Sequence, residues 1–277
     1  MNIFTAIEKN KYEIIKQITK KNPSLINSLN EYNDTPLHFA CRQDNFNINI
    51  IKLLIENNAN VNTVNDNNDT VLHLLSKHDD DNNYCNNDTE YLEKIIDEWN
   101  DIIEYILNKD ITVETINAIN NDNENAIFLT YNNYKAKNET QKLLLLKGIT
   151  IDNINTKSGY NNQTLLMHAC EHGNKHDVLF LLSKGANVNE KDIAGMNALI
   201  IVALHNNVGN IGKILIDKGI EINKDDELEV MALEICTTKN KKSKTYNKLL
   251  NDFGMIIGYT YGQAHHNFPD IDDENEE

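Results

Sequence analysis

The segment from residue 79 to residue 90 carries oxygen-bearing side chains at a spacing that could bind calcium. Five of them occupy positions one, three, five, nine and twelve of a twelve-residue loop: Asp79, Asp81, Asn83, Asn87 and Glu90. Carboxylate and amide oxygens are the hard ligands that Ca²⁺ prefers, and a loop of this length can wrap one ion. Tyr84, however, stands where such loops need glycine for a sharp turn, and Asn86 replaces an apolar residue. We therefore predict a solvated acidic loop, with a calcium-dependent regulatory module as the alternative.

A second group of possible metal ligands consists of His168, Cys170, His172 and His176. His168 and His172 are four residues apart, which places them on one face of a helix. Imidazole and thiolate groups bind zinc, but one short helix closes a four-ligand site with poor geometry. Cys170 also stands at a small-residue position of the repeat described below. The sequence therefore predicts no metal site and no cofactor.

No motif commits the chain to catalysis. It contains no glycine-rich phosphate loop and no G-x-S-x-G nucleophile turn. Cys85 is a single cysteine in an acidic segment, and neighbouring negative charge disfavours the thiolate that a nucleophile needs. We predict that the protein is not an enzyme.

Charge and composition narrow the class of partner. The 277 residues carry a net charge of −16, from 26 basic and 42 acidic residues, and Arg42 is the only arginine. Nucleic-acid-binding proteins use clustered Lys and Arg against phosphates, and anionic membranes also attract basic surfaces. The longest apolar run, Ala198–Leu204, is far shorter than the ~20 residues of a membrane span. We therefore expect neither nucleic acid nor a membrane as a partner.

The remaining compositional features concern the compartment and the genome. The four cysteines lie far apart and are too few for a disulfide scaffold, which favours a reducing, cytoplasmic location. The first residues alternate charged and apolar side chains, so no secretory signal is expected there. Asparagine makes up about one residue in six, which we interpret as AT-rich coding without chemical meaning.

Internal repeats organise the chain. One motif recurs as TPLHFAC at Thr35–Cys41, TVLHLL at Thr70–Leu75 and TLLMHAC at Thr164–Cys170. A second motif recurs as LLIENNANVN at Leu53–Asn62, LLSKGANVN at Leu181–Asn189 and LIDKGIEIN at Leu215–Asn223. These motifs resemble the ankyrin repeat, whose unit carries T-P-L-H-x-A followed by a Leu-Leu-x-x-Gly-Ala close. A small residue ending the first motif recurs at Ala6, Ala40, Leu75, Thr130, Ala169, Val202 and Cys236, at spacings of 34, 35, 55, 39, 33 and 34.

The resemblance implies an all-α solenoid of six or seven helix–turn–helix units over residues 1–254. Thr35 before Pro36 suits a helix N-cap followed by the first helical position. Gly185 and Gly219, with Asn58 in the first copy, suit the left-handed position that ends a helix.

One repeat deviates from the common length. The long spacing predicts an insertion in the second repeat, at about residues 78–100, which continues into an amphipathic helix over Glu90–Leu107. The acidic run that ends residues 255–277 predicts a disordered tail.

For function, the resemblance implies a non-enzymatic scaffold that binds another protein through the concave face of the array. The repeat-variable positions give the candidate partner-binding residues: Tyr32, Asp34, Arg42, Asp66, Asp69, Glu124, Tyr160, Glu171, Ile193, Met196 and Leu204. The first half of this set is acidic and the second ends in an apolar group, so we expect a partner with a basic segment and an apolar anchor. We expect the protein itself to be a monomer.

Overall fold

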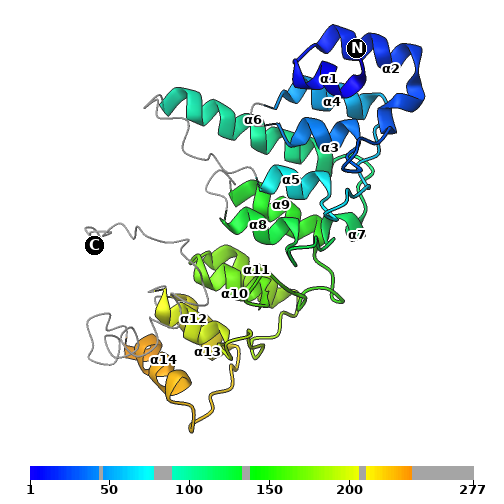
Figure 1. The fold of residues 1–277 in the computed structure, drawn as a ribbon. Helices are drawn as coiled ribbons and strands as arrows, with labels where there is room; N and C mark the ends of the chain where they lie inside the picture. Colours follow the sequence, from blue (N-terminus) through cyan, green and yellow to red (C-terminus); the bar gives the residue numbers. More distant parts are fainter. Residues whose placement is uncertain (44–45, 78–88, 133–137, 206–209, 239–277) are drawn as a thin grey trace. The chain divides into compact units, whose positions relative to one another are not determined.

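The computed structural model describes the chain except for residues 44–45, 78–88, 133–137, 206–209 and 239–277 (Figure 1). It divides into two compact units. Unit 1 contains residues 1–169 and 176–187, and unit 2 contains residues 170–175 and 188–277. The predicted calcium loop falls almost entirely, and the acidic tail wholly, outside the described residues, so both stay predictions, as does the domain boundary after residue 254.

Unit 1 consists of paired helices in two rows. The elements are α1 (Ile3–Glu8), α2 (Tyr12–Lys21), the 3₁₀ helix η1 (Pro23–Asn27), α3 (Pro36–Cys41), α4 (Ile48–Glu56), α5 (Val71–Ser76), α6 (Thr89–Leu107), α7 (Val113–Ile116), α8 (Ala126–Asn132) and α9 (Asn138–Gly148). Helices α1, α3, α5 and α8 pack one against the next, and α2, α4, α6 and α9 form the second row. Each helix of the first row also contacts its successor in the second, as expected for stacked helix–turn–helix units.

Two further helices contribute residues to both units, α10 (Leu165–Glu171) and α11 (Lys175–Ser183). A short antiparallel pair precedes them, β1 (Lys157–Ser158) with β2 (Gln163–Thr164), in which Lys157 faces Thr164. Unit 2 adds α12 (Ala198–Leu204), α13 (Asn210–Asp217) and α14 (Glu227–Thr238), which contact one another. Gly212 allows the close approach of α13 to α14, because a Cβ there would lie 2.7 Å from Cys236 Sγ.

The predicted amphipathic helix over Glu90–Leu107 is confirmed as α6, which runs from Thr89 to Leu107. Its described core side chains are buried, among them Ile102, Ile103 and Ile106. Trp99 is also buried and donates a 2.7 Å hydrogen bond from Nε1 to the Leu75 carbonyl at the end of α5. This bond satisfies the indole N–H inside the core. None of the helices in the described part of the chain is both long and apolar enough to cross a membrane.

The histidine of the repeat motif connects one repeat to the next. Nδ1 of His73 lies 2.8 Å from the Thr70 hydroxyl and 3.2 Å from the Thr70 backbone N, at the start of α5. Nε2 of the same ring lies 3.0 Å from the Glu124 carbonyl oxygen. A carbonyl only accepts, so Nε2 carries the proton and Nδ1 accepts the Thr70 N–H. His38 repeats the arrangement with Thr35 and with the Thr63 carbonyl at 3.1 Å.

Asparagine builds the loops between repeats. Oδ1 of Asn30 accepts the backbone N–H groups two and four residues later, at 2.9 Å each, and Asn65 and Asn120 do the same in the next two loops. A second set of asparagines takes positive φ angles of 50–66°: Asn33, Asn58, Asn68, Asn123 and Asn162. Asn tolerates this left-handed conformation better than any residue except glycine. The interpretation of the asparagine enrichment as chemically meaningless is therefore wrong for these loops.

Candidate functional site

The loop tips of unit 1 are joined to one another by hydrogen bonds. We call residues 30–34, 65–69, 120–124 and 158–162 the loop row. The N–H of Asp66 donates to the Tyr32 carbonyl at 3.3 Å, and Asn33 Nδ2 donates to Asp66 Oδ1 at 2.5 Å. The chain that follows repeats this pattern, so that the four loops form one continuous surface.

Two further junctions complete the loop row. The Asn121 N–H donates to the Asn67 carbonyl at 2.9 Å, and Asn68 Nδ2 donates to Asn121 Oδ1 at 2.7 Å. The Gly159 N–H then donates to the Asn123 carbonyl at 2.6 Å. The first three loops are thereby held both by their own asparagine and by a neighbouring loop, and the fourth is held by Asn123 of the third.

Two aromatic side chains of the predicted set are exposed at the tips of this row. Tyr32 is 57% exposed and Tyr160 is 82% exposed. Asp66 is exposed beside them, whereas Glu124 is partly buried. Large aromatic rings held in water on ordered loops are typical of binding surfaces.

Two predicted carboxylates lie inside the molecule instead of on its surface. Asp34 is fully buried and accepts hydrogen bonds from Arg42 Nη2 at 2.8 Å and from Asn65 Nδ2 at 3.0 Å. Asp69 is buried and accepts from Asn120 Nδ2 at 2.9 Å. Both therefore join adjacent repeats and hold the loops in place. The prediction that Asp34 and Asp69 lie on the partner-binding surface is therefore corrected: both are buried and support the loops from within.

Lys77 lies among three carboxylates in unit 1. Its Nζ is 3.3 Å from Asp69, 3.1 Å from Asp122 and 3.4 Å from Glu124. Partial burial acts to lower the pKa of Lys77, but the hydrogen bond to Asp122 and the charges of Asp69 and Glu124 outweigh it, and the pKa is raised. One ammonium cannot balance three carboxylates, so this part of the surface keeps excess negative charge.

The predicted apolar group of unit 2 is divided by burial. Ile193 is 68% exposed, while Met196 and Leu204 are buried. The Met196 N–H donates to Asp192 Oδ1 at 2.9 Å, which closes the loop, and Leu204 lies on α12, every residue of which is buried. Met196 and Leu204 are therefore core residues. Leu29, which is absent from the predicted set, is 57% exposed next to the loop that carries Tyr32. Its position just before a variable loop is the sequence feature that could have identified it.

The comparisons with known proteins agree with this architecture. A family model described as ankyrin repeats (3 copies) matches residues 3–117 and 128–226. The chain belongs to the ankyrin-repeat family. Ankyrin repeats generally mediate protein–protein interaction, and the fold is typically a non-enzymatic module. No curated protein matches the sequence.

Solved structures show the same ankyrin-repeat fold at low sequence identity. The ankyrin-repeat domain of Bcl-3, a member of the IkappaB family, is 19% identical, with a TM-score of 0.58 over 91% of this chain and 98% of that one. The ankyrin-repeat protein EF0377 is 21% identical, with a TM-score of 0.55 over 79% and 97%. A chain in the complex of the endopeptidase Bd0816 from Bdellovibrio bacteriovorus with the immunity protein Bd3460 is 23% identical, with a TM-score of 0.54 over 78% and 97%.

The remaining predicted residue, Glu171, lies in unit 2 of the ankyrin-repeat protein and is largely buried. Its Oε1 is 3.7 Å from His205 Nε2. Burial, followed by the nearby charge of Asp192, raises the pKa of Glu171 to about 7. The carboxyl group therefore titrates near neutrality, far above its ordinary value of 4.5.

This shift predicts a pH-dependent stability. A carboxyl whose pKa is higher in the folded state binds its proton more tightly there, so its contribution to stability is fully present below about pH 4.5 and is lost as pH rises through about 7. We expect Glu171→Gln, which stays neutral, to unfold at higher urea concentration than the parent at pH 8, by on the order of 1–2 kcal/mol, and to match it near pH 4. Urea titrations at both pH values measure the difference. An equal gap at both would contradict this prediction.

Other groups that could do chemistry are held in the packing. Cys41, Cys170 and Cys236 are buried; burial raises the pKa of the Cys236 thiol to about 12 and that of the other two as well. The possible metal ligands around α10, for which the sequence predicts no metal site, are brought together only in part, and Glu171 joins them. On one helical stretch, ligand atoms of His168, Glu171 and His172 lie within 4.8 Å of one another. One turn supplies fewer ligands than a structural zinc site needs, and we keep the prediction of no metal.

Proposed function

We propose that this ankyrin-repeat protein is a non-enzymatic scaffold that binds a partner protein through the concave face of its array, and that the partner presents a basic segment. The loop row is the observation that carries the proposal. Its backbone is cross-linked from residue 32 to residue 159 by hydrogen bonds between neighbouring tips. Loops ordered before binding avoid much of the entropy cost that association imposes on flexible loops.

Electrostatics supports a basic partner. Asp66 and Asp122 are exposed on the loop row, and Lys77 offsets only part of the charge of Asp69, Asp122 and Glu124. The whole chain carries a net charge of −16. Charge of one sign on an interface mainly steers the encounter with a partner of the opposite sign.

Affinity capture from cells that naturally produce the protein, followed by mass spectrometry and crosslinking, tests the proposal. We expect a captured protein to crosslink within the loop row or the helices beneath it. Crosslinks confined to α2, α4, α6 or the residues after 238 would overturn the concave-face proposal.

A charge-removal variant tests the electrostatic component. We expect Asp66→Asn with Asp122→Asn to slow association by roughly three- to tenfold at low salt, because attraction over distances near the ~10 Å Debye length is lost. Dissociation should change little, and the salt dependence of association should flatten. Surface plasmon resonance with the captured partner at low and high salt measures both rates. Asp101→Asn with Asp152→Asn, two exposed acids outside the loop row, is the matched control, and equal effects from the two pairs would contradict the prediction.

A further inference from the structure

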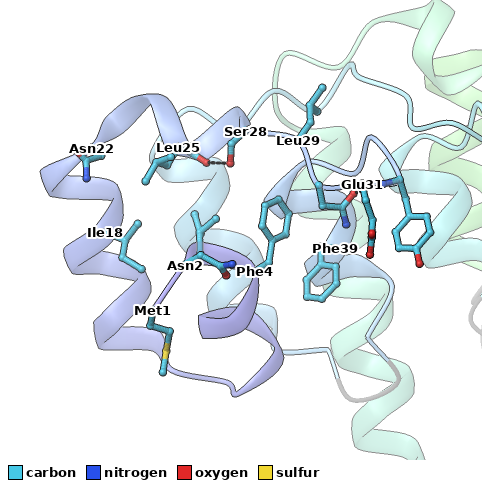
Figure 2. Close-up of a pocket in the computed structure, with 13 residues that line it drawn as sticks. Met1, Asn2, Phe4, Ile18, Asn22, Leu25, Ser28, Leu29, Glu31 and Phe39 are labelled. Atoms are coloured by element: carbon cyan, nitrogen blue, oxygen red, sulfur yellow. Dashed lines mark hydrogen bonds between the residues drawn. The ribbon is translucent and has the colours of Figure 1, made fainter.

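A cavity of about 550 Å³ lies beside the first loop of the row (Figure 2). It opens to solvent and is lined by residues of α1, the end of α2, η1, the first loop and α3, all within unit 1. Ile3, Phe4, Ile18, Leu25 and Phe39 supply much of an apolar lining. The volume falls within the range of about 300–1,000 Å³ typical of binding pockets. It has room for one large side chain with its adjoining backbone.

The aromatic rings of the cavity are already ordered. Phe4 on α1 and Phe39 on α3 meet edge to face, with ring centroids 5.5 Å apart (Figure 2). Leu29 and Tyr32, which also line the cavity, are each 57% exposed. Covering solvent-exposed apolar groups around a cavity with a matching apolar group is favourable, because it removes apolar surface from water.

The loop side of the cavity carries negative charge. Glu31 is the one lining residue with a carboxylate side chain, and it is exposed on the first loop. Asp66 lies against the same loop, because its backbone N–H donates to the Tyr32 carbonyl and its carboxylate accepts from Asn33. A group that fills the cavity therefore has the Glu31 carboxylate beside it, and Asp66 is bonded to the same loop.

We propose that this cavity receives an aromatic or branched aliphatic side chain of the partner, and that the residues flanking this side chain are lysine or arginine. The inference rests on the proposed function, and it adds a chemical signature for the partner segment. The apolar side chain loses its contact with water against Phe4 and Phe39. The flanking cations lie within reach of Glu31 and Asp66, where opposite charge favours them.

Methyl NMR of the full chain with short synthetic peptides tests the proposal. The probe is a peptide with a central phenylalanine between lysines; one matched peptide has serine at the centre, and another has glutamates in place of the lysines. We expect the first peptide to shift the methyl signals of Ile3, Ile18 and Leu25 saturably, at least about tenfold more tightly than either matched peptide. Ile151, which is exposed away from the cavity, should not shift. Equal binding of the serine peptide, or equal shifts at Ile151, would overturn the proposal.

Two substitutions and two matched controls localise the effect. Leu29→Lys and Glu31→Gln should each weaken the phenylalanine–lysine peptide several-fold, the first by removing apolar lining and adding a repelling charge. Leu146→Lys, at a leucine of α9 that is 54% exposed, and Glu104→Gln, on α6, should leave the peptide's affinity unchanged. Glu31→Gln changes an exposed side chain and so keeps the test valid if Leu29→Lys fails to fold. Loss of affinity in the controls as well would contradict the assignment to this cavity.

The same variants separate this inference from the proposed function. If the captured partner crosslinks to the loop row but binds Leu29→Lys and Glu31→Gln like the parent, the cavity proposal alone is wrong. If the peptide occupies the cavity while the captured partner crosslinks elsewhere, the concave-face proposal is wrong and the cavity remains an apolar–basic peptide site. Failure of both measurements rejects both.

Discussion

Replacing Tyr32 and Tyr160 together by alanine is expected to weaken binding of the captured partner by about 2–4 kcal/mol, mainly through faster dissociation. Both rings are exposed, so their removal opens no cavity and leaves the core unchanged. Both stand on loops whose backbones are held by hydrogen bonds from neighbouring repeats. A few rigid aromatic residues usually carry most of an interface's energy, because they bury a large area at a small entropy cost.

The control for this double variant is Leu146→Ala with Ile151→Ala. These apolar side chains are also exposed in unit 1 but lie outside the loop row. Surface plasmon resonance should show parental dissociation for the control and accelerated dissociation for the tyrosine variant, with identical circular dichroism spectra. Parental affinity in the tyrosine variant would mean that the partner binds another surface.

The second large effect concerns the histidine that joins repeats. His73→Ala should lower the free energy of unfolding by about 2–4 kcal/mol, because it leaves a cavity and removes the partner of both the Thr70 N–H and the Glu124 carbonyl. The ring is fully buried, and burial lowers its pKa, so the neutral form that makes both bonds is the stable one. Urea titration followed by circular dichroism measures the loss.

The chain itself offers the matched substitution. In α10, Met167 occupies the position that His73 has in α5, three residues after the threonine that begins the motif. Its Sδ lies 3.4 Å from the Thr164 backbone N. His73→Met should therefore fill the volume and lose mainly the bond to Glu124, at a cost of about 1–2 kcal/mol. A methionine variant as unstable as the alanine variant would show that packing contributes little at this position, contrary to the prediction.

Much of the local structure was predictable from residue types. Thr35 and Thr70 are the N-caps of α3 and α5. Each side-chain oxygen accepts the backbone N–H of the residue three positions later, as an N-cap threonine should. Gly185, Gly219 and Asn58 have the positive φ angles that their places in the motif require. These features depend on a few neighbouring residues, so a repeated motif is enough to predict them.

Which carboxylates face water was not predictable. Asp34, Asp66 and Asp69 all occupy variable loop positions of the motif, yet Asp66 is exposed and the other two are buried. The difference arises because Asn65 and Asn120, one repeat further along, approach Asp34 and Asp69. The asparagine that bonds each aspartate is 31 or 51 residues away, and no local pattern states that these side chains will meet.

The sequence by itself determined the ankyrin-repeat family, the places of the repeated helices, and the acidic character of the chain, because these depend on periodicity, local turn chemistry and summed charge. Only the tertiary structure decided that Met196 and Leu204 belong to the core, that asparagines join the loop tips into one row, and that Phe4, Phe39 and Glu31 line the same cavity. The physical reason is that burial and hydrogen-bond pairing are properties of adjacent repeats in contact. A single repeat cannot bury its own faces, so the fate of each variable side chain is decided by the neighbour that packs against it.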